Sequence, residues 1–177
     1  MPTVSSFSGT AFAAFREFAT RDPDYDELKN VANSIVPFGM LAGVRIIELT
    51  PDHAIAEVPE SQDVKNHVDT VHAAALYLAA DFAGAVSLVG AAPADVGQVE
   101  WMVVRGGHST FLKPALGRIR AVGTVDERDV RAIARRSGPG RFDLDGKASL
   151  YDDDNVLVAK FTFEYACQLA APVPSAA

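Results

Sequence analysis

The sequence predicts an α+β protein in which an antiparallel sheet wraps around one long central helix, preceded by an N-terminal helical extension. Residues 72–89 (HAAALYLAADFAGAVSLV) form one apolar run, too long for a strand and free of internal proline. Such a helix has no polar face, so it must be buried on all sides. The segments on either side have the period-two alternation of strands, and they do not alternate with helices as a parallel sheet would require.

The N-terminal part is expected to be helical. Apolar residues recur at helical spacing over residues 10–36, with a break at 21–24 because Pro23 disfavours helix before it, and a second helix is expected over 24–34. We therefore divide the chain into a helical extension (1–36), a main domain (37–170) and a disordered tail (171–177).

The strands of the main domain are expected on both sides of the central helix. Residues 44–49 and 53–58 form a hairpin around Thr50-Pro51-Asp52. After the helix, segment 126–136 is charged and irregular, and Gly106-Gly107 marks a bend or bulge in the first long strand. The remaining strands are predicted at 99–112, 118–125, 141–152 and 156–169.

Composition excludes several classes of protein. The 177 residues, 49% hydrophobic and 22% charged, suit one globular domain. A net charge of −7 and a pI near 5.0 argue against nucleic-acid binding.

The single cysteine, Cys167, allows no internal disulfide and no cysteine-based zinc site. The histidines show no ligand spacing, so we expect no metal and no cofactor. The N-terminus has no basic segment before its apolar part, which predicts a cytoplasmic protein, and we expect no membrane partner.

Asp81 is the only charged residue within the apolar run at 72–89. No cation stands three or four residues from it, and an ionised carboxylate buried without a partner costs several kcal/mol, roughly. Either the surrounding sheet or a subunit contact satisfies this group, or it faces a cavity and serves a function.

The start of the central helix is a second candidate. Thr70 is the predicted N-cap, and the amides of His72, Ala73 and Ala74 would then lack intrahelical acceptors. Such amides can bind an anion or an oxygen that becomes negative during a reaction. The structural alternative is plain capping of the helix, with His72 as a buried and satisfied histidine.

His72 and Asp81 stand nine residues apart, about 13 Å along a helix and on opposite sides of it. They could contribute to one site only if a second copy of the helix lay alongside. We therefore expect a homodimer with two composite sites, which could assemble further as a dimer of dimers.

The pattern N-x5-H-x8-D, formed by Asn66, His72 and Asp81, resembles the acyl-CoA thioesterases of the hotdog fold, especially the phenylacetyl-CoA type. Residues 111–119 (FLKPALGRI) are similar to a strand-turn-strand segment of these enzymes, and the resemblance covers residues 37–169. It implies hydrolysis of an acyl-CoA or acyl-carrier thioester. In that case Asp81 would be general base or nucleophile, the Ala73 amide would polarise the carbonyl, Asn66 would orient water or substrate, and His72 would support the carbonyl side.

The chain departs from this family at two positions. His72-Ala73-Ala74 replaces His-Gly-Gly, and Val104 stands where many relatives place Ser or Thr. These departures keep open a related uncharacterised hotdog subfamily, and a non-catalytic protein that binds acyl-CoA or lipid. A hotdog dehydratase or hydratase is a further, weaker alternative.

The expected substrate contacts beyond the catalytic group are Ala74, Arg128 and Arg131. The two arginines belong to a basic patch that would contact the phosphates of CoA, or that forms an ordinary solvated face.

Overall fold

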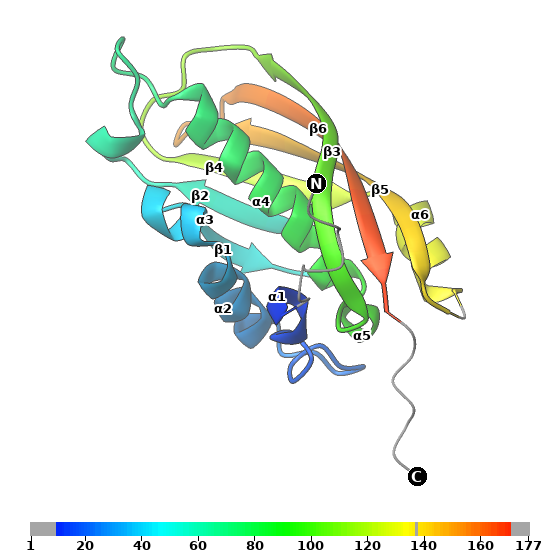
Figure 1. Cartoon of the computed structure of the whole chain (residues 1–177). Helices are drawn as coiled ribbons and strands as arrows, with labels where there is room; N and C mark the ends of the chain where they lie inside the picture. The colour runs from blue at the N-terminus through cyan, green and yellow to red at the C-terminus, as the bar shows by residue number, and fades with distance from the viewer. Residues whose placement is uncertain (1–9, 137, 171–177) are drawn as a thin grey trace, which may run out of the picture.

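The computed structural model describes residues 10–136 and 138–170, and it has the expected α+β architecture (Figure 1). A six-stranded antiparallel sheet has the strand order β1-β2-β4-β5-β6-β3, and the helix α4 (Ala73–Ala91) lies across one of its faces. The strands are β1 (Arg45–Leu49), β2 (Ala54–Val58), β3 (Val99–Phe111), β4 (Ile119–Val125), β5 (Gly140–Tyr151) and β6 (Leu157–Leu169). All six lie where the sequence predicts strands.

Small residues bring α4 unusually close to the sheet. A Cβ atom on Gly123 of β4 would collide with the main chain at Ala83, and one on Gly90 would collide with the carbonyl of Thr50. The first long strand also has the expected irregularity, because the register between β3 and β6 shifts between Val104 and Gly106. Backbone therefore packs directly on backbone along one side of the helix.

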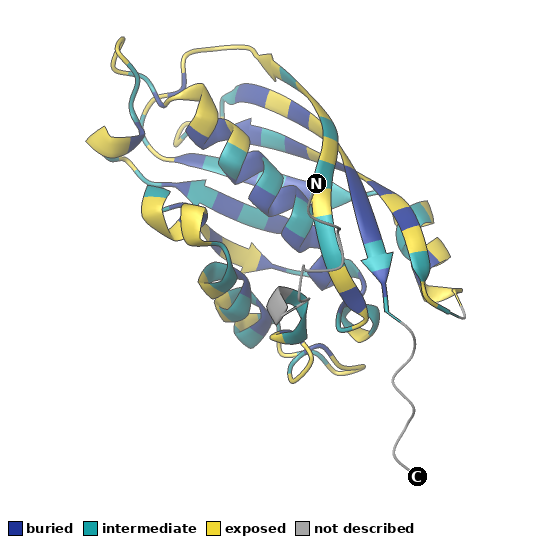
Figure 2. Cartoon of the chain, in the orientation of Figure 1, coloured by how far each residue is buried: buried dark blue, intermediate teal, exposed yellow. Residues whose placement is uncertain are grey.

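The burial of α4 is less complete than its sequence predicts. Most of the helix is buried, but one stripe at helical spacing is exposed or only partly covered (Figure 2). Side chains three and four residues apart lie on one face of a helix. The stripe consists of Ala74, Tyr77, Leu78, Asp81 and Ala85. One face of the central helix is thus left open by the chain's own sheet.

The N-terminal helices differ from the prediction. The first helix, α1 (Thr10–Ala13), has only four residues, because the chain then turns with hydrogen bonds between residues three apart and buries Phe15. The second, α2 (Tyr25–Ile35), begins at the N-cap Asp24 as expected. Its Asn33 side chain bonds both main-chain groups of Ile46 at 2.8 and 2.9 Å, which fixes α2 to the edge strand β1.

Several further short helices were not predicted. Pro37 starts α3 (Pro37–Ala42), since proline is compatible with the first turn of a helix. The charged segment after β4 forms α6 (Glu127–Ala134), which is capped by Asp126 and packs Ile133 into the core. The short elements η2 (Gln62–Val64) and α5 (Pro93–Val96) flank α4. The boundary at residue 36 stays a prediction, and the tail 171–177 lies outside the described residues.

Within the described part of the chain, α4 is the one helix long and apolar enough to cross a membrane. Of its most apolar window, 67% is buried inside the fold. That degree of burial is expected of the core helix of a globular domain.

Candidate functional site

Asp81 lies on the open stripe of α4, where its side chain is only partly exposed. Burial raises the pKa of its carboxyl from an ordinary value of 3.8 to about 6, and hydrogen bonding by the Tyr165 hydroxyl limits the rise. The Asp81 carboxyl has no ion-pair partner among the described residues. Asp81 is thus a carboxylate at neutral pH that is more basic than usual.

Aromatic side chains surround this carboxyl on the sheet side. Tyr77, one turn before Asp81, makes edge-on contacts with Phe161 and Phe163 of β6, with ring centroids 5.6 and 5.4 Å apart. Tyr165, the next inward residue of β6, donates a hydrogen bond from its hydroxyl to the main-chain carbonyl of Asp81 at 3.2 Å. In the sequence this wall is indicated only by alternate aromatic residues on the last strand.

The helix begins two residues later than predicted. The N-cap is His72, whose Nδ1 accepts a hydrogen bond from the Ala74 amide at 3.0 Å. Thr70 does not cap the helix because residues 71 and 72 remain extended before it; the Thr70 hydroxyl accepts from the Asn66 side chain at 2.8 Å. The bridge between Lys65 and Val71 also keeps the chain extended at this point.

Of the three expected amides at the helix start, one remains available. The His72 amide donates to the carbonyl of Val64 at 2.7 Å, and the Ala74 amide is taken by His72. The Ala73 amide has no acceptor within residues 10–136 and 138–170, and Ala73 is exposed. A free amide at the first position of a 19-residue helix can stabilise an oxygen that gains negative charge.

Asn66 lies in the loop before the helix and holds that loop in shape. Its Oδ1 accepts from the amides of Val68 and Thr70 at 3.0 and 3.1 Å. Asp69 adopts a left-handed conformation within the same turn (φ 61°) and forms an ion pair with Lys65. Asn66 therefore positions the segment that leads to His72.

The structure does not bring all the predicted site residues together within one chain. Ala73 and His72 are at the start of α4, and Asp81 is more than two turns further along. Arg128 and Arg131 lie on α6 and pair with Asp126 and Glu127 at 2.9 and 3.4 Å. They line an open cavity of about 1130 Å³, which neither Ala73 nor Asp81 lines.

The charged groups that line this cavity are of both signs. Lys147 and Thr124 face each other across β5 and β4, and the Thr124 hydroxyl is buried with no hydrogen-bond partner among the described atoms. Asp145, Glu164 and the two paired arginines also contribute to its walls. Because acidic and basic groups line the same cavity, its lining does not favour a ligand of one particular charge.

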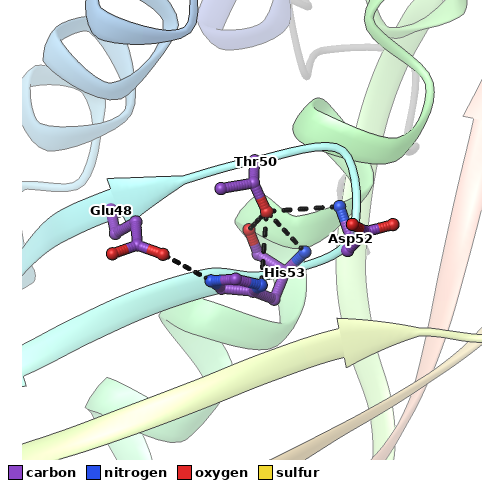
Figure 3. Close-up of polar contacts among 4 residues, drawn as sticks. All are labelled: Glu48, Thr50, Asp52 and His53. Carbon is purple, nitrogen blue, oxygen red and sulfur yellow. Dashed lines mark hydrogen bonds and ion pairs between the residues drawn. The ribbon is translucent and has the colours of Figure 1, made fainter.

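A separate polar cluster stabilises the β1–β2 turn (Figure 3). His53 contacts Glu48 through Nε2 at 2.6 Å and Thr50 through Nδ1 at 3.2 Å. The Thr50 oxygen also accepts from the amides of Asp52 and His53, so it is engaged as a turn cap. No group of three or more His, Cys, Asp or Glu side chains in the described residues could hold a metal ion.

Comparison with protein families identifies the chain. A family model described as "Domain of unknown function (DUF4442)" matches residues 26–166. The chain belongs to this family. The match begins within the predicted extension and includes α2. No curated protein matches the chain.

Solved structures share the architecture of this DUF4442 protein. PA5026 from Pseudomonas aeruginosa, described as "Probable Thioesterase", is 20% identical with a TM-score of 0.67, over 82% of this chain and 96% of that one. A thioesterase family protein from Silicibacter pomeroyi is 17% identical with a TM-score of 0.64, over 83% and 100%. OLEI01261 from Chlorobaculum tepidum, of unknown function, is 24% identical with a TM-score of 0.67, over 88% and 99%.

These likenesses confirm the hotdog fold that the N-x5-H-x8-D pattern implied, and the resemblance to hotdog-fold proteins of the thioesterase families. At such low identity they establish the fold. The chemistry of this chain has to be argued from its own residues.

The pKa of Asp81 makes a prediction about stability. Because its pKa is higher in the folded state, the folded state binds more protons between pH 3.8 and 6, and stability falls as pH rises through that window. Asp81→Asn removes this dependence. We expect the variant to gain about 2 to 3 kcal/mol relative to wild type between pH 4 and pH 8.

Urea unfolding of both proteins across that range measures the gain. Asp52→Asn, which changes an exposed carboxyl, is the control. A difference between Asp81→Asn and wild type that stays constant with pH would show that Asp81 has no raised pKa.

Proposed function

We propose that this protein hydrolyses the thioester of an acyl-CoA or acyl-carrier substrate, with Asp81 as the reacting acid and the Ala73 amide as the oxyanion donor. The single observation that carries the proposal is the pairing, on one buried helix, of an unpaired carboxylate on its open face with a free amide at its start. The hotdog fold of thioesterase-family structures supports the same chemistry.

The proposed reaction needs a base and a stabilised oxygen. In one route the Asp81 carboxylate takes a proton from water, the hydroxide attacks the thioester carbon, and the C–S bond breaks as the sulfur leaves and is protonated to a thiol. In the other route the carboxylate attacks the thioester carbon, the C–S bond of the resulting adduct breaks, and the thiolate leaves and is protonated. The mixed anhydride that remains on Asp81 is then hydrolysed by water. In both routes the carbonyl oxygen becomes negative beside the Ala73 amide. A pKa near 6 leaves Asp81 ionised at neutral pH, as both routes require.

The other site residues have supporting roles in this proposal. His72 places the Ala73 amide by capping the helix, and Asn66 holds the preceding loop from which it could also orient water or substrate. Ala74 lies on the open stripe and would contact the acyl group. Arg128 and Arg131 would bind CoA phosphates only by exchanging their own carboxylate partners for a phosphate.

Removal of the Asp81 charge tests the proposal. We expect Asp81→Asn to lower kcat/KM for acyl-CoA hydrolysis by about 10²- to 10⁴-fold, and the wild-type value to fall below about pH 6 as Asp81 is protonated. Asp95→Asn is the matched control, because burial raises the pKa of that carboxyl too but it lies outside α4. Thiol release from a panel of acyl-CoA substrates is the measurement. Equal rates in wild type and Asp81→Asn would remove Asp81 from the mechanism.

Removal of the Ala73 N–H is a second test. Proline suits this position, because Ala73 is the first residue of α4 and His72 already has the extended conformation (ψ 139°) that precedes proline. Ala73→Pro should therefore fold and lose about 10²- to 10³-fold in kcat. Ala73→Ser, which keeps the amide, should retain turnover in the same thiol assay. Full activity in a folded Ala73→Pro protein would mean that another group stabilises the oxyanion.

We propose further that the active protein is a homodimer. Ala73 and Asp81 are on different parts of one helix, so one substrate carbonyl can meet both only if the helices of two copies run side by side. Two surfaces suit such an arrangement: the open stripe of α4, and the edge strand β3, which exposes Val103 and Phe111. If two such dimers assembled further, the second interface would use surfaces other than the α4 stripe and β3.

Co-expression of the two inactive variants tests the composite site. A dimer of one Asp81→Asn chain and one Ala73→Pro chain would hold one intact site. Random pairing makes about half of the dimers mixed, so activity should return to about a quarter of the wild-type value. Each variant expressed alone is the control. No recovery in purified mixed dimers would place both groups within one chain.

The alternative function is binding without catalysis. The methyl group of Ala73 narrows the approach to the amide, and Val104 supplies no hydroxyl, so these two departures favour a non-catalytic acyl-CoA or lipid-binding protein. Tight acyl-CoA binding in calorimetry with no thiol release would establish that function, and rapid crotonyl-CoA hydration would establish a hydratase.

A further inference from the structure

Tyr165 is held in a slot formed by two glycines. Its side chain is completely buried on β6. A Cβ atom on Gly84 of α4 would lie 2.6 Å from the Tyr165 hydroxyl oxygen, and one on Gly146 of β5 would lie 2.7 Å from the edge of the ring. Real Cβ atoms do not approach other atoms so closely, so the tyrosine occupies space that only glycine leaves free at both positions.

The slot directs the hydroxyl to the turn of α4 that carries Asp81. The hydroxyl donates to the main-chain carbonyl of Asp81 at 3.2 Å, and the Phe163 ring lies beside the Tyr165 ring, tilted by 31°, at 5.7 Å between centroids. The titratable groups near it are Asp81 and Tyr77 from α4 and Cys167 from β6, none of them positively charged. No cation among these groups can hold the carboxylate in place, so the contact of the hydroxyl with the main chain of Asp81 is the polar contact that fixes this turn.

We propose that Tyr165 is a positioning residue for Asp81: its hydroxyl anchors the helix turn through the main-chain carbonyl of Asp81 and lies on the sheet side of the carboxyl. The inference rests on the proposed function for its catalytic meaning. The physical contact between the two residues can be tested without any substrate. Sequence alone could not show it, because Tyr165 and Asp81 are 84 residues apart.

The expected effect of removing the Tyr165 hydroxyl follows from which form of the Asp81 carboxyl it favours. The hydroxyl favours the charged form of Asp81, whereas burial disfavours it. Without the hydroxyl, the carboxyl should therefore protonate at higher pH. One neutral hydrogen bond corresponds to a shift on the order of half a pH unit or more.

Carboxyl titration by ¹³C NMR tests the proposal on the apo protein. Aspartate-labelled wild type is compared with Tyr165→Phe, and Asp81→Asn assigns the resonance. We expect the Asp81 midpoint to move upward in Tyr165→Phe. Tyr25→Phe is the matched control, because the Tyr25 hydroxyl donates to the carbonyl of Gly90 on the same helix and lies far from Asp81 along it. That variant should leave the midpoint unchanged.

A second variant reaches the same contact from the helix. Alanine at position 84 would push the hydroxyl away, although alanine is the better helix former. Gly84→Ala should therefore raise the Asp81 midpoint and lower Tm by several degrees. In the Tyr165→Phe background the nearest remaining atoms are at 3.6 Å, an ordinary contact distance. There Gly84→Ala should leave the midpoint unchanged and should no longer lower Tm.

The outcomes separate this inference from the proposed function. An Asp81 midpoint that coincides in wild type, Tyr165→Phe and Gly84→Ala overturns the role of Tyr165, whether or not the protein is an enzyme. An upward shift in both variants supports that role even if thiol release is absent. If the protein does hydrolyse thioesters, the acid limb of kcat/KM should shift with the NMR midpoint, which a purely structural tyrosine would not produce.

Discussion

The architecture depends on the close fit of one apolar helix against a curved sheet. Gly123 and Gly90 allow main chain to pack on main chain, which leaves little space for water or side chains along that side of α4. The same fit leaves no room for a charged side chain on the side of the helix that the sheet covers. Asp81 lies on that side, partly exposed, with an aromatic wall between it and the core. Its chemical character follows from this position.

Two opposing effects set the properties of that carboxyl. Burial raises its pKa to about 6, and the hydroxyl of Tyr165 lowers it. The result is a group that is ionised at neutral pH and yet more basic than an exposed aspartate, which suits a general base. At the other end of the open stripe, capping by His72 satisfies one amide and leaves that of Ala73 free. Base and oxyanion donor thus come from one helix but from positions too far apart to act within one copy.

Several parts of this picture could be predicted from the sequence because their signals are local. The apolar run at 72–89 indicated the central helix, period-two alternation indicated the strands, and a charge within the run pointed to Asp81. The prediction was wrong where the local signal was weak, or where tertiary contacts determined the local structure. Few apolar residues in 126–136 concealed α6, and Thr70 is not the N-cap because main-chain contacts with Ala115 and Val64 keep residues 71 and 72 outside the helix. The contact between Asp81 and Tyr165 depends on the register of the whole sheet, which no local pattern contains.

The most direct test of the central claim is a crystal structure with a stable ketone analogue of an acyl-CoA, in which a methylene replaces the sulfur. We expect its carbonyl oxygen to accept a hydrogen bond from the Ala73 amide of one copy, with the Asp81 carboxyl of the partner subunit facing the carbonyl carbon. An analogue bound with its carbonyl remote from both groups, for example in the cavity lined by Arg128 and Lys147, would contradict the account.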